Sequence, residues 1–479
     1  MPLRPFILCF LLIFFLAAKV ANAQSLPPAV ELALKRAHIP LSGVAAYVQG
    51  VDSARPLLEH NAAQAMNPAS TMKLVTTYAA LELLGPTYTW KTEAYAAGKL
   101  QGDTLQGDLI LKGYGDPKLT LENFWLLLRK LRALGLREIR GNLVQDRSYF
   151  EPAAHDPAKF YAEPLRAYNV GSDALLLNFK AVRFHFVPDA DTKIVTVIAE
   201  PRPAGLEFAA AVRATDGACG DWRAGIKADF QSNGGSARAG FSGSMPASCG
   251  ERYWNASLLA QPNYVYGVFR QLWEELGGTI TGGWRDGVLP ADARLLATGK
   301  SASNAELARD INKFSNNVMA RQLFLTLGAE MLALPGNSER SGQVVRSWLA
   351  QKRLDFPELV LENGSGLSRQ ERISAEHMAS LLLEAWRSAV MPELMSSLPL
   401  VAYDGTMRRR LRFESIAGQA HIKTGSLADA RTLAGYVLDQ RGQRRVVVLF
   451  INHANAAAAQ PAQDALLQWV YEGAGRHRN

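Results

Sequence analysis

The chain has 479 residues, of which 48% are hydrophobic and 20% are charged. This composition is typical of globular proteins and argues against disordered, collagen-like and coiled-coil chains. At about 150 residues per domain, the length predicts roughly three domains. The net charge of +8 comes without a dense Lys/Arg block or an aromatic-interleaved basic stripe, which argues against nucleic-acid binding. The cysteines and histidines show neither C-x-x-C nor H-E-x-x-H spacing, so the sequence predicts no metal site of those types.

The first 23 residues have the parts of a secretory signal peptide. Arg4 gives a positive start, residues 6–18 are a nearly unbroken apolar run, and residues 21–23 form an A-x-A cleavage pattern. The run is short for a membrane span, and no second stretch of about 18 apolar residues follows. We therefore expect a removable signal over 1–23 and an exported protein without a transmembrane segment after its removal. An uncleaved N-terminal anchor is the alternative.

Hydrophobic periodicity predicts a mixed chain of helices and strands without a fixed-period repeat. Residues 209–250 are rich in Gly, Ser and Ala, and we expect them to form a loop-rich β subdomain. The other expected elements, in chain order, are a strand over 44–51, a helix over 70–85, short strands within 87–112, a helix over 119–134, strands over 139–144, 182–186 and 193–199, a helix over 264–276, one or two helices within 303–329, a helix over 374–386, strands over 432–438 and 444–451, and a helix over 461–471.

Two cysteines remain once the signal is removed. Cys219 and Cys249 lie in similar strings, ACGDW and SCGER. A single remaining pair in an exported chain predicts one disulfide. It would close a loop of about 30 residues and contribute roughly 3–4 kcal/mol in the chain-entropy model. Two free thiols are the alternative.

The first chemical motif is Ser70-Thr71-Met72-Lys73, which has the form S-x-x-K at the start of an expected helix. Positions i and i+3 share one helix face, so the Lys73 amine can reach the Ser70 hydroxyl. A serine needs a base to become a nucleophile, and a partly desolvated lysine can supply one. The backbone N–H groups of a helix start suit an oxyanion. An N-capping serine beside a solvated lysine is the alternative for this motif alone.

Two further motifs follow later in the chain. Ser315-Asn316-Asn317 has the form S-x-N, which by itself is equally typical of a helix cap. Lys423-Thr424-Gly425 has the rarer form K-T-G and precedes the expected C-terminal strands. A glycine there lets a substrate backbone approach closely. Each pattern occurs once, and the order S-x-x-K, S-x-N, K-T-G is typical of penicillin-binding proteins and class A β-lactamases.

Over its whole mature length, the chain resembles the class C low-molecular-mass penicillin-binding proteins. This D-alanyl-D-alanine carboxypeptidase/endopeptidase group includes penicillin-binding protein 4. The gap between Lys73 and Ser315 is far longer than in a β-lactamase, and the group carries a large insertion there. Four further segments are similar to segments of the group: LKGYGDPKLT (111–120), IRGNLVQDRSYF (139–150), NGSGLSRQERIS (363–374) and DGTMRRRL (404–411).

The resemblance implies an α/β (α+β) fold with a transpeptidase domain like that of penicillin-binding proteins and serine β-lactamases, in which an α cluster packs on an antiparallel sheet. This catalytic domain would be split into 24–90 and 290–479. The region 91–289 would form one or two smaller inserted domains, with the candidate disulfide among them. The disulfide itself has no counterpart in the pattern shared by the group. The expected location is the periplasm, either soluble or peripherally associated with the membrane.

The resemblance also implies an acyl-serine mechanism that needs no metal and no cofactor. Ser70 would attack the carbonyl of the penultimate D-Ala, and Lys73 would take its proton. The backbone N–H groups of Ser70 and Ser426 would form the oxyanion hole. Ser315 would help to relay a proton to the leaving amine.

Substrate binding is implied in the same way. Asn317 would hold the substrate amide, Lys423 and Thr424 of the K-T-G motif would bind the terminal carboxylate, and Gly425 would let the substrate backbone approach. The expected partners are peptidoglycan peptides ending in D-Ala-D-Ala, with β-lactam antibiotics as inhibitors.

Asp146 and Arg369 are further candidates for substrate binding. Both lie in group-like segments and would contact a charged diaminopimelate side chain of the peptide. A turn aspartate and a solvated arginine are the alternatives.

Two other functions compete with the peptidase hypothesis. A serine β-lactamase shares the motifs, but it is usually shorter, and the class A form has S-D-N where this chain has Asn at position 316. A wall-binding module without catalytic activity would keep the fold and lose turnover. The intact motifs argue against the latter. The sequence does not separate carboxypeptidase from endopeptidase preference, and it leaves the oligomeric state open.

Overall fold

The two ends of the chain build one sheet, here called the terminal sheet. The computed structural model describes residues 26–160 and 163–473, so the predicted signal over 1–23 lies outside the described residues. The strands of the terminal sheet are β1 (Val44–Gly50), β2 (Pro56–His60), β16 (Ala420–Leu427), β17 (Ala430–Leu438) and β18 (Arg444–Asn452). All neighbours are antiparallel in the order β16-β17-β18-β1-β2, with Val44 opposite Ile451.

Helices cover both faces of the terminal sheet, which explains its apolar strands. The seven central residues of β18 are all buried, and strands buried on both faces read as continuous apolar runs. One face carries α1 (Pro28–Arg36) and α10 (Gln460–Tyr471). The other carries the helix cluster, formed by α2 (Lys73–Leu83), α5 (Asn304–Phe314), α6 (Asn317–Leu332), α7 (Ser338–Gln351), α8 (Ala375–Arg387) and α9 (Met391–Ser397).

Helix α2 is the central helix of this cluster. Its residues 73–81 are all buried, as expected for a helix surrounded by protein on every side. The sequence predicts one helix starting at Ser70, but the structure places Ser70 in a separate 3₁₀ turn, Ala69–Met72, and α2 begins at Lys73. Ala69 has a φ of 45°, and this left-handed residue breaks the regular helical path before the serine.

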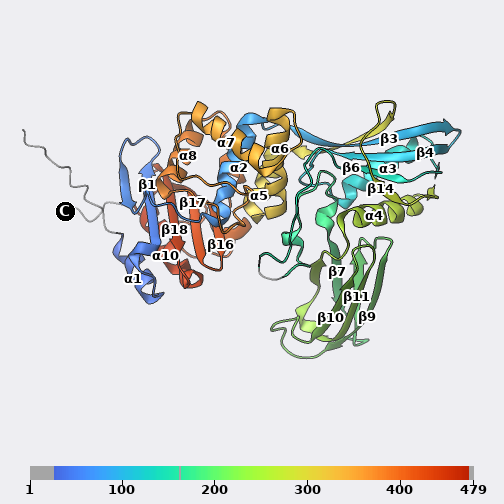
Figure 1. Cartoon of the computed structure of the whole chain (residues 1–479). Helices are drawn as coiled ribbons and strands as arrows, with labels where there is room; N and C mark the ends of the chain where they lie inside the picture. The colour runs from blue at the N-terminus through green and yellow to red at the C-terminus, as the bar shows by residue number, and fades with distance from the viewer. Residues whose placement is uncertain (1–25, 161–162, 474–479) are drawn as a thin grey trace, which may run out of the picture.

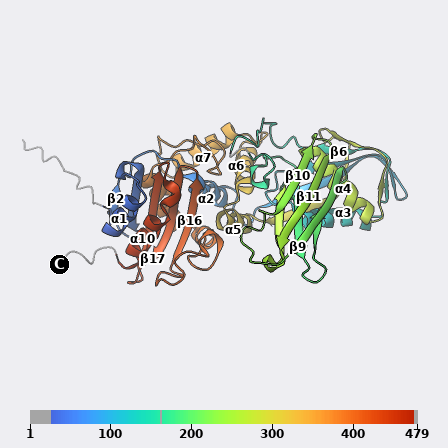
Figure 2. The same ribbon diagram turned by 90° about the horizontal axis from the view of Figure 1, so that it is seen from below.

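A second sheet lies beyond the helix cluster. It is formed by β3 (Thr89–Gln101), β4 (Thr104–Gly113), β5 (Glu138–Ile139), β6 (Leu143–Asp146), β13 (Thr279–Ile280), β14 (Trp284–Asp286) and β15 (Arg294–Ser303). Helices α3 (Leu121–Ala133) and α4 (Gln261–Glu275) pack on it. The terminal sheet and this second sheet stand at opposite ends of the molecule, with α5 and α6 between them (Figures 1 and 2).

A third sheet completes the inserted region. Its strands are β7 (Val182–Pro188), β8 (Ile194–Glu200), β9 (Leu206–Thr215), β10 (Ile226–Ser232), β11 (Ala237–Pro246) and β12 (Arg252–Ala256), in the order β10-β11-β9-β8-β7-β12. The predicted disulfide is present: Cys219 and Cys249 are bonded, with their Cα atoms 4.7 Å apart. The second and third sheets share one hydrophobic core, which includes Phe124, Phe184 and Phe269.

The structure differs from the predicted segment boundaries at one point. Strand β15 pairs with β3, with Arg294 opposite Ala96, so residues 294–303 belong to the second sheet, although the sequence predicts them in the split catalytic half. The helix cluster resumes at Asn304.

Within residues 26–160 and 163–473, no helix combines the length and apolar character needed to cross a membrane.

Candidate active site

Ser70 is presented by a tightly held turn at the edge of the terminal sheet. The Asn67 side chain accepts a hydrogen bond from the Ala69 N–H at 2.9 Å. The Thr432 hydroxyl, from β17, donates to the Pro68 carbonyl at 2.7 Å. Ala69 is held in the left-handed region that L residues seldom adopt, and such strain is tolerated where the surroundings fix the conformation. The turn therefore sets the position of the Ser70 hydroxyl.

Lys73 is the centre of a buried polar cluster. Its side chain is 0% exposed, and its Nζ lies 3.0 Å from Ser70 Oγ and 2.6 Å from Asn317 Oδ1. It also donates to the Ser365 carbonyl oxygen. Asn317 begins α6, so two helices and one loop converge on this amine. The structure thus brings the S-x-x-K and S-x-N motifs into direct contact.

A second buried lysine joins the remaining motif to the site. Lys423 on β16 is 0% exposed, and its Nζ donates to Ser315 Oγ at 2.9 Å and to the Thr424 carbonyl at 2.7 Å. Ser315 ends α5 in a left-handed conformation, with a φ of 55°. This turn between α5 and α6 places Ser315 on Lys423 and Asn317 on Lys73.

Two glycines let the backbone segments approach Ser70. A Cβ at Gly425 would lie 2.7 Å from the Ser70 backbone nitrogen, and one at Gly366 would lie 1.8 Å from the Ala69 carbonyl oxygen. Both distances are shorter than real Cβ contacts, and Gly366 also has a φ of 78°. Hence β16 and the loop carrying Gly366 pack directly against the serine turn on either side.

The electrostatics of the site favour neutral amines. Burial lowers the pKa of Lys73 well below its ordinary value, and the Lys423 and Arg321 charges act in the same direction, while Glu371 opposes them. Burial also lowers the pKa of Lys423 to about 7. A neutral amine 3.0 Å from a serine hydroxyl can accept its proton. The geometry therefore fits general-base activation of Ser70 by Lys73.

The K-T-G strand offers polar groups at the opening of the site. Thr424 is partly exposed, Ser426 is exposed and Gly425 is buried. The Thr424 hydroxyl oxygen lies 2.7 Å from that of Thr406, which comes from the 3₁₀ turn Gly405–Met407. Two hydroxyls beside a buried lysine suit a carboxylate ligand.

Asp146 does not lie in this cluster. It is on β6 of the second sheet, directly beside Lys112 of β4, whose Nζ is 3.3 Å from its carboxylate. Its carboxylate also accepts hydrogen bonds from the Ser148 hydroxyl and N–H and from the Leu289 N–H. Because its side chain is 0% exposed, the predicted peptide contact is not supported. The structure gives Asp146 a scaffold role in the sheet.

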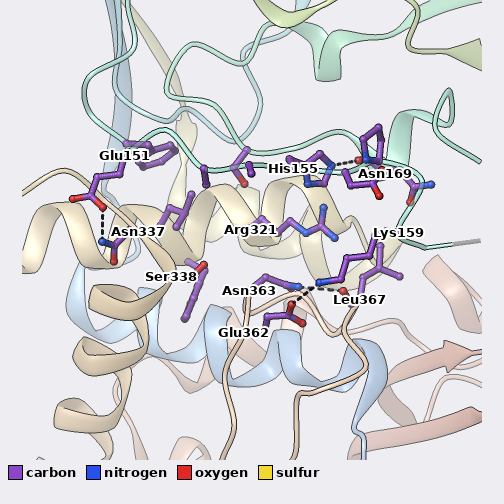
Figure 3. A pocket seen from close by; sticks show the side chains of 18 of the residues that line it. Glu151, His155, Lys159, Asn169, Arg321, Asn337, Ser338, Glu362, Asn363 and Leu367 are labelled. Carbon is purple, nitrogen blue, oxygen red and sulfur yellow. Dashed lines mark hydrogen bonds and ion pairs between the residues drawn. The ribbon is translucent and has the colours of Figure 1, made fainter. Parts of the chain in front are cut away.

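Arg369 lines a cavity of about 450 Å³ beside the site. Its exposed guanidinium lies over the Phe160 ring at 5.2 Å. Leu367 and Asn363, which follow and precede the residues packed on Ser70, line the same cavity. Figure 3 shows Arg321 pointing from α6 into this space, between His155 and Asn363. The cavity thus lies beside the site and has both cationic and acidic side chains on its walls.

A second cavity, of about 550 Å³, lies at the start of α6. Its walls include Ser315 and Asn317 together with Phe314, Lys118 and Arg183 from the helix cluster and the inserted region. It gives a bulky substrate room next to the predicted catalytic residues. Across the described part of the chain, no group of three or more His, Cys, Asp or Glu is placed to hold a metal ion.

The fold and the Ser–Lys site place the protein in the class of penicillin-binding proteins and related serine enzymes. The chain matches the model of the D-Ala-D-Ala carboxypeptidase 3 (S13) family over residues 28–472, and it belongs to that family. By class it is therefore a serine D-Ala-D-Ala carboxypeptidase, a hydrolase of the cell wall.

Individual relatives agree with this assignment. The D-alanyl-D-alanine carboxypeptidase of Actinomadura sp. is 30% identical over 457 residues, which cover 91% of this chain and 82% of the relative. Penicillin binding protein 4 of Haemophilus influenzae has a similar fold, with a TM-score of 0.77 at 23% identity, covering 92% of this chain and 99% of that one. Its structure with a β-lactam gives a TM-score of 0.71. A predatory peptidoglycan endopeptidase of Bdellovibrio bacteriovorus matches with a TM-score of 0.53 at 15% identity, over 90% of this chain and 92% of that one.

Four residues around Lys73 and Thr424 have no role in the sequence analysis. Thr406, Ser365 and Glu371 lie in the DGTMRRRL and NGSGLSRQERIS segments, which were noted only for their resemblance. Arg321 lies one helical turn after Asn317. That spacing, i and i+4 on one helix face, is the one signal by which Arg321 could have been found.

Proposed function

We propose that this chain cleaves D-Ala-D-Ala stem peptides and their cross-links through an acyl ester on Ser70. The observation that carries the proposal is the buried Lys73 amine, 3.0 Å from Ser70 Oγ and 2.6 Å from Asn317 Oδ1. In the first step Ser70 Oγ bonds to the carbonyl carbon of the penultimate D-Ala while Lys73 takes the hydroxyl proton. The oxyanion forms beside the backbone N–H groups of Ser70 and Ser426.

The leaving group departs on the Ser315 side. Collapse of the tetrahedral intermediate breaks the C–N bond, and the proton that Lys73 took passes through Ser315, which is hydrogen-bonded to Lys423, to the amine of the leaving D-Ala. Water then attacks the acyl carbon and breaks the ester C–O bond, so that its hydroxyl joins the shortened peptide acid and its other proton goes to Ser70 Oγ. Asn317 holds the substrate amide, and Lys423 with Thr424 holds the terminal carboxylate.

The same acyl ester serves both hydrolytic outcomes. A terminal D-Ala as leaving group gives carboxypeptidase activity, and the amine of a second peptide gives endopeptidase activity. The relative from Bdellovibrio is named a peptidoglycan endopeptidase, and the cavity beside Ser315 leaves space for a bulky leaving group. A β-lactam would acylate Ser70 by the same chemistry, as the β-lactam complex of the Haemophilus relative suggests.

Arg369 is proposed to bind the peptide, because its exposed guanidinium lies at the cavity beside the Ser70 turn and has no ion pair among the described residues. A carboxylate on the diaminopimelate side chain is a suitable partner. Residues 1–23 are proposed to be a secretory signal, so that the mature enzyme meets its substrate in the periplasm.

Labelling with a fluorescent penicillin tests this function. The mature wild-type chain should give a stable covalent band, and Ser70→Ala should give none. Ser396→Ala, at an exposed serine on α9, is the matched control and should label normally. Absence of a band together with hydrolysed penicillin would instead show a β-lactamase. Absence of both would show a wall-binding module without activity.

Purified muropeptides separate the two peptidase activities. Liquid chromatography with mass spectrometry should show loss of one D-Ala from pentapeptides and conversion of cross-linked dimers to monomers. Both products should disappear in Ser70→Ala. Dimers that stay intact while pentapeptides are trimmed would remove the endopeptidase part of the proposal.

A further inference from the structure

A fully buried carboxylate organises the loop that faces Lys73. Glu371 is 0% exposed, and its Oε1 accepts hydrogen bonds from the backbone N–H groups of Glu362, Asn363 and Gly364 at 3.2, 2.9 and 2.8 Å. Its Oε2 accepts from the Gly366 N–H at 2.9 Å. One side chain therefore fixes almost every residue of the 362–366 loop.

This loop delivers two groups to the site. The Ser365 carbonyl accepts a hydrogen bond from Lys73 Nζ, and Gly366 packs against Ala69 and the Ser70 backbone. The Thr76 hydroxyl, on the next turn of α2, donates to the Gly364 carbonyl at 2.6 Å and ties the loop to the same helix as Lys73. Movement of the loop would therefore displace the acceptor on which the Lys73 amine is oriented.

Arg321 supplies an opposing charge from the other side. It lies one turn after Asn317 on α6, is 9% exposed, and has no ion pair within the described residues. Its Nε has no hydrogen-bond partner there, and its only hydrogen bond, to the Val170 carbonyl, is long at 3.5 Å. Burial lowers the pKa of Arg321, while the charges of Glu371 and Glu362 oppose this effect.

We propose that Glu371 and Arg321 are opposed positioning residues for Lys73. Glu371 holds the 362–366 loop against the amine and, when ionised, acts on it as a negative charge, which Arg321 offsets from α6. Burial raises the pKa of Glu371, and the backbone N–H groups of the loop oppose this rise. The charged groups that act on Lys73 come from three elements: Lys423 on β16, Arg321 on α6 and Glu371 after the loop. The inference rests on the proposed function, in which Lys73 is the base.

The test is the pH dependence of acylation by a fluorescent penicillin in the purified mature chain. The rate should rise with pH as Lys73 becomes a free amine. In Glu371→Gln the anion is lost, so the ammonium form is less favoured and the rising limb should move to lower pH by about one unit. In Arg321→Gln a cation is lost, and the limb should move to higher pH. The double variant should return towards the wild-type midpoint.

The rate at high pH reports the positioning role. Gln at 371 keeps an acceptor for three N–H groups but sets an NH₂ group against the Gly366 N–H, so the loop loosens beside Ser70. The plateau should fall roughly 100-fold, as small misplacements in catalytic sites do. Glu371→Asp keeps the charge and shortens the reach. It should therefore lower the plateau while leaving the limb in place.

Glu358→Gln is the matched control. Glu358 is a half-buried carboxylate that accepts the Ser374 N–H and contacts His377, and it is not among the charges acting on Lys73. Its limb and plateau should match the wild type. Limbs that stay in place in both Gln variants would overturn the charge role, and an unchanged plateau in Glu371→Gln would overturn the positioning role. Labelling that survives Ser70→Ala would instead remove the proposed function itself.

Discussion

The candidate active site and the second sheet hold their buried charged side chains in opposite ways. At the candidate active site, Lys73 on α2 and Lys423 on β16 are 0% exposed, and neither has an acidic partner within ion-pair distance among the described residues. In the second sheet, Asp146 is equally buried but faces Lys112 at 3.3 Å and accepts hydrogen bonds from Ser148 and the Leu289 N–H. The first arrangement disfavours the charged form, and the second favours it.

The pKa shifts follow this difference. Burial lowers the pKa of both lysines towards the neutral amine. Burial alone would raise the pKa of Asp146, but its hydrogen bonds from Ser148 and Leu289 and the Lys112 charge outweigh burial and lower it. An unpaired buried cation costs stability and is retained where a neutral amine serves chemistry. A paired carboxylate serves the scaffold.

The largest effect is expected from breaking the first arrangement. Lys73→Met keeps the volume and removes the base, so the second-order rate of acylation by a fluorescent penicillin should fall by about 1,000-fold. Folding stability, measured by urea unfolding, should change by less than about 1 kcal/mol, because removing the cost of burying a polar amine offsets the loss of its hydrogen bonds. Acylation that persists in this variant would mean that another group takes the serine proton.

Breaking the pair of Asp146 and Lys112 should lower stability and leave acylation nearly unchanged. Asp146→Asn removes the partner of Lys112 and should destabilise the fold by about 3 kcal/mol, with penicillin acylation within twofold of the wild type. The folded pKa of Asp146 is lowered, so its contribution to stability is present above the unfolded pKa of about 4 and is lost as the pH falls through the folded value. The difference between wild type and variant in urea unfolding should therefore shrink on acidification. Normal stability together with lost peptide turnover would restore Asp146 as a substrate ligand.

The sequence predicted the site wherever chemistry is written in local spacing. S-x-x-K, S-x-N and K-T-G each place their residue types at fixed separations. In the structure Lys73 contacts Ser70 and Asn317, and Lys423 contacts Ser315, while the catalytic roles of these residues stay predictions. The disulfide and most helices and strands also follow from local pattern. These features depend on the periodicity or spacing of neighbouring residues.

The features that the sequence does not predict depend on contacts between segments that are far apart in the chain. The Ser365 carbonyl that orients Lys73 is a backbone atom without any residue signature, and Glu371 acts through N–H groups up to nine residues before it. Asp146 lies in a segment that resembles that of the family, and no local pattern predicts that its side chain is buried beside Lys112. The pairing of β15 with β3 joins segments that lie far apart in the chain, so no local pattern predicts which sheet β15 joins.

The pH dependence of KM separates the roles of the two buried lysines. Lys423 has a pKa of about 7, so in the free enzyme its ammonium form is present below that pH and is lost above it. If it binds the terminal carboxylate, the KM for a D-Ala-D-Ala peptide should rise above pH 7 by up to about tenfold per pH unit. The corresponding peptide amide has no terminal carboxylate for Lys423 to bind, so its KM should change little with pH.

Lys423→Arg provides the internal control, because a guanidinium stays charged across this range. The KM for the free-carboxylate peptide should then be independent of pH up to about 9, even if the longer side chain raises it at every pH. The limb set by Lys73 appears in kcat/KM for both peptides and cancels in the acid-to-amide ratio, so the ratio isolates Lys423. An acid-to-amide ratio that does not change with pH in the wild type would mean that the carboxylate is held by the Thr424 and Thr406 hydroxyls without help from the lysine charge. The two lysines would then be equally buried but differ in role: Lys73 would act as the base, and Lys423 would act only on Ser315.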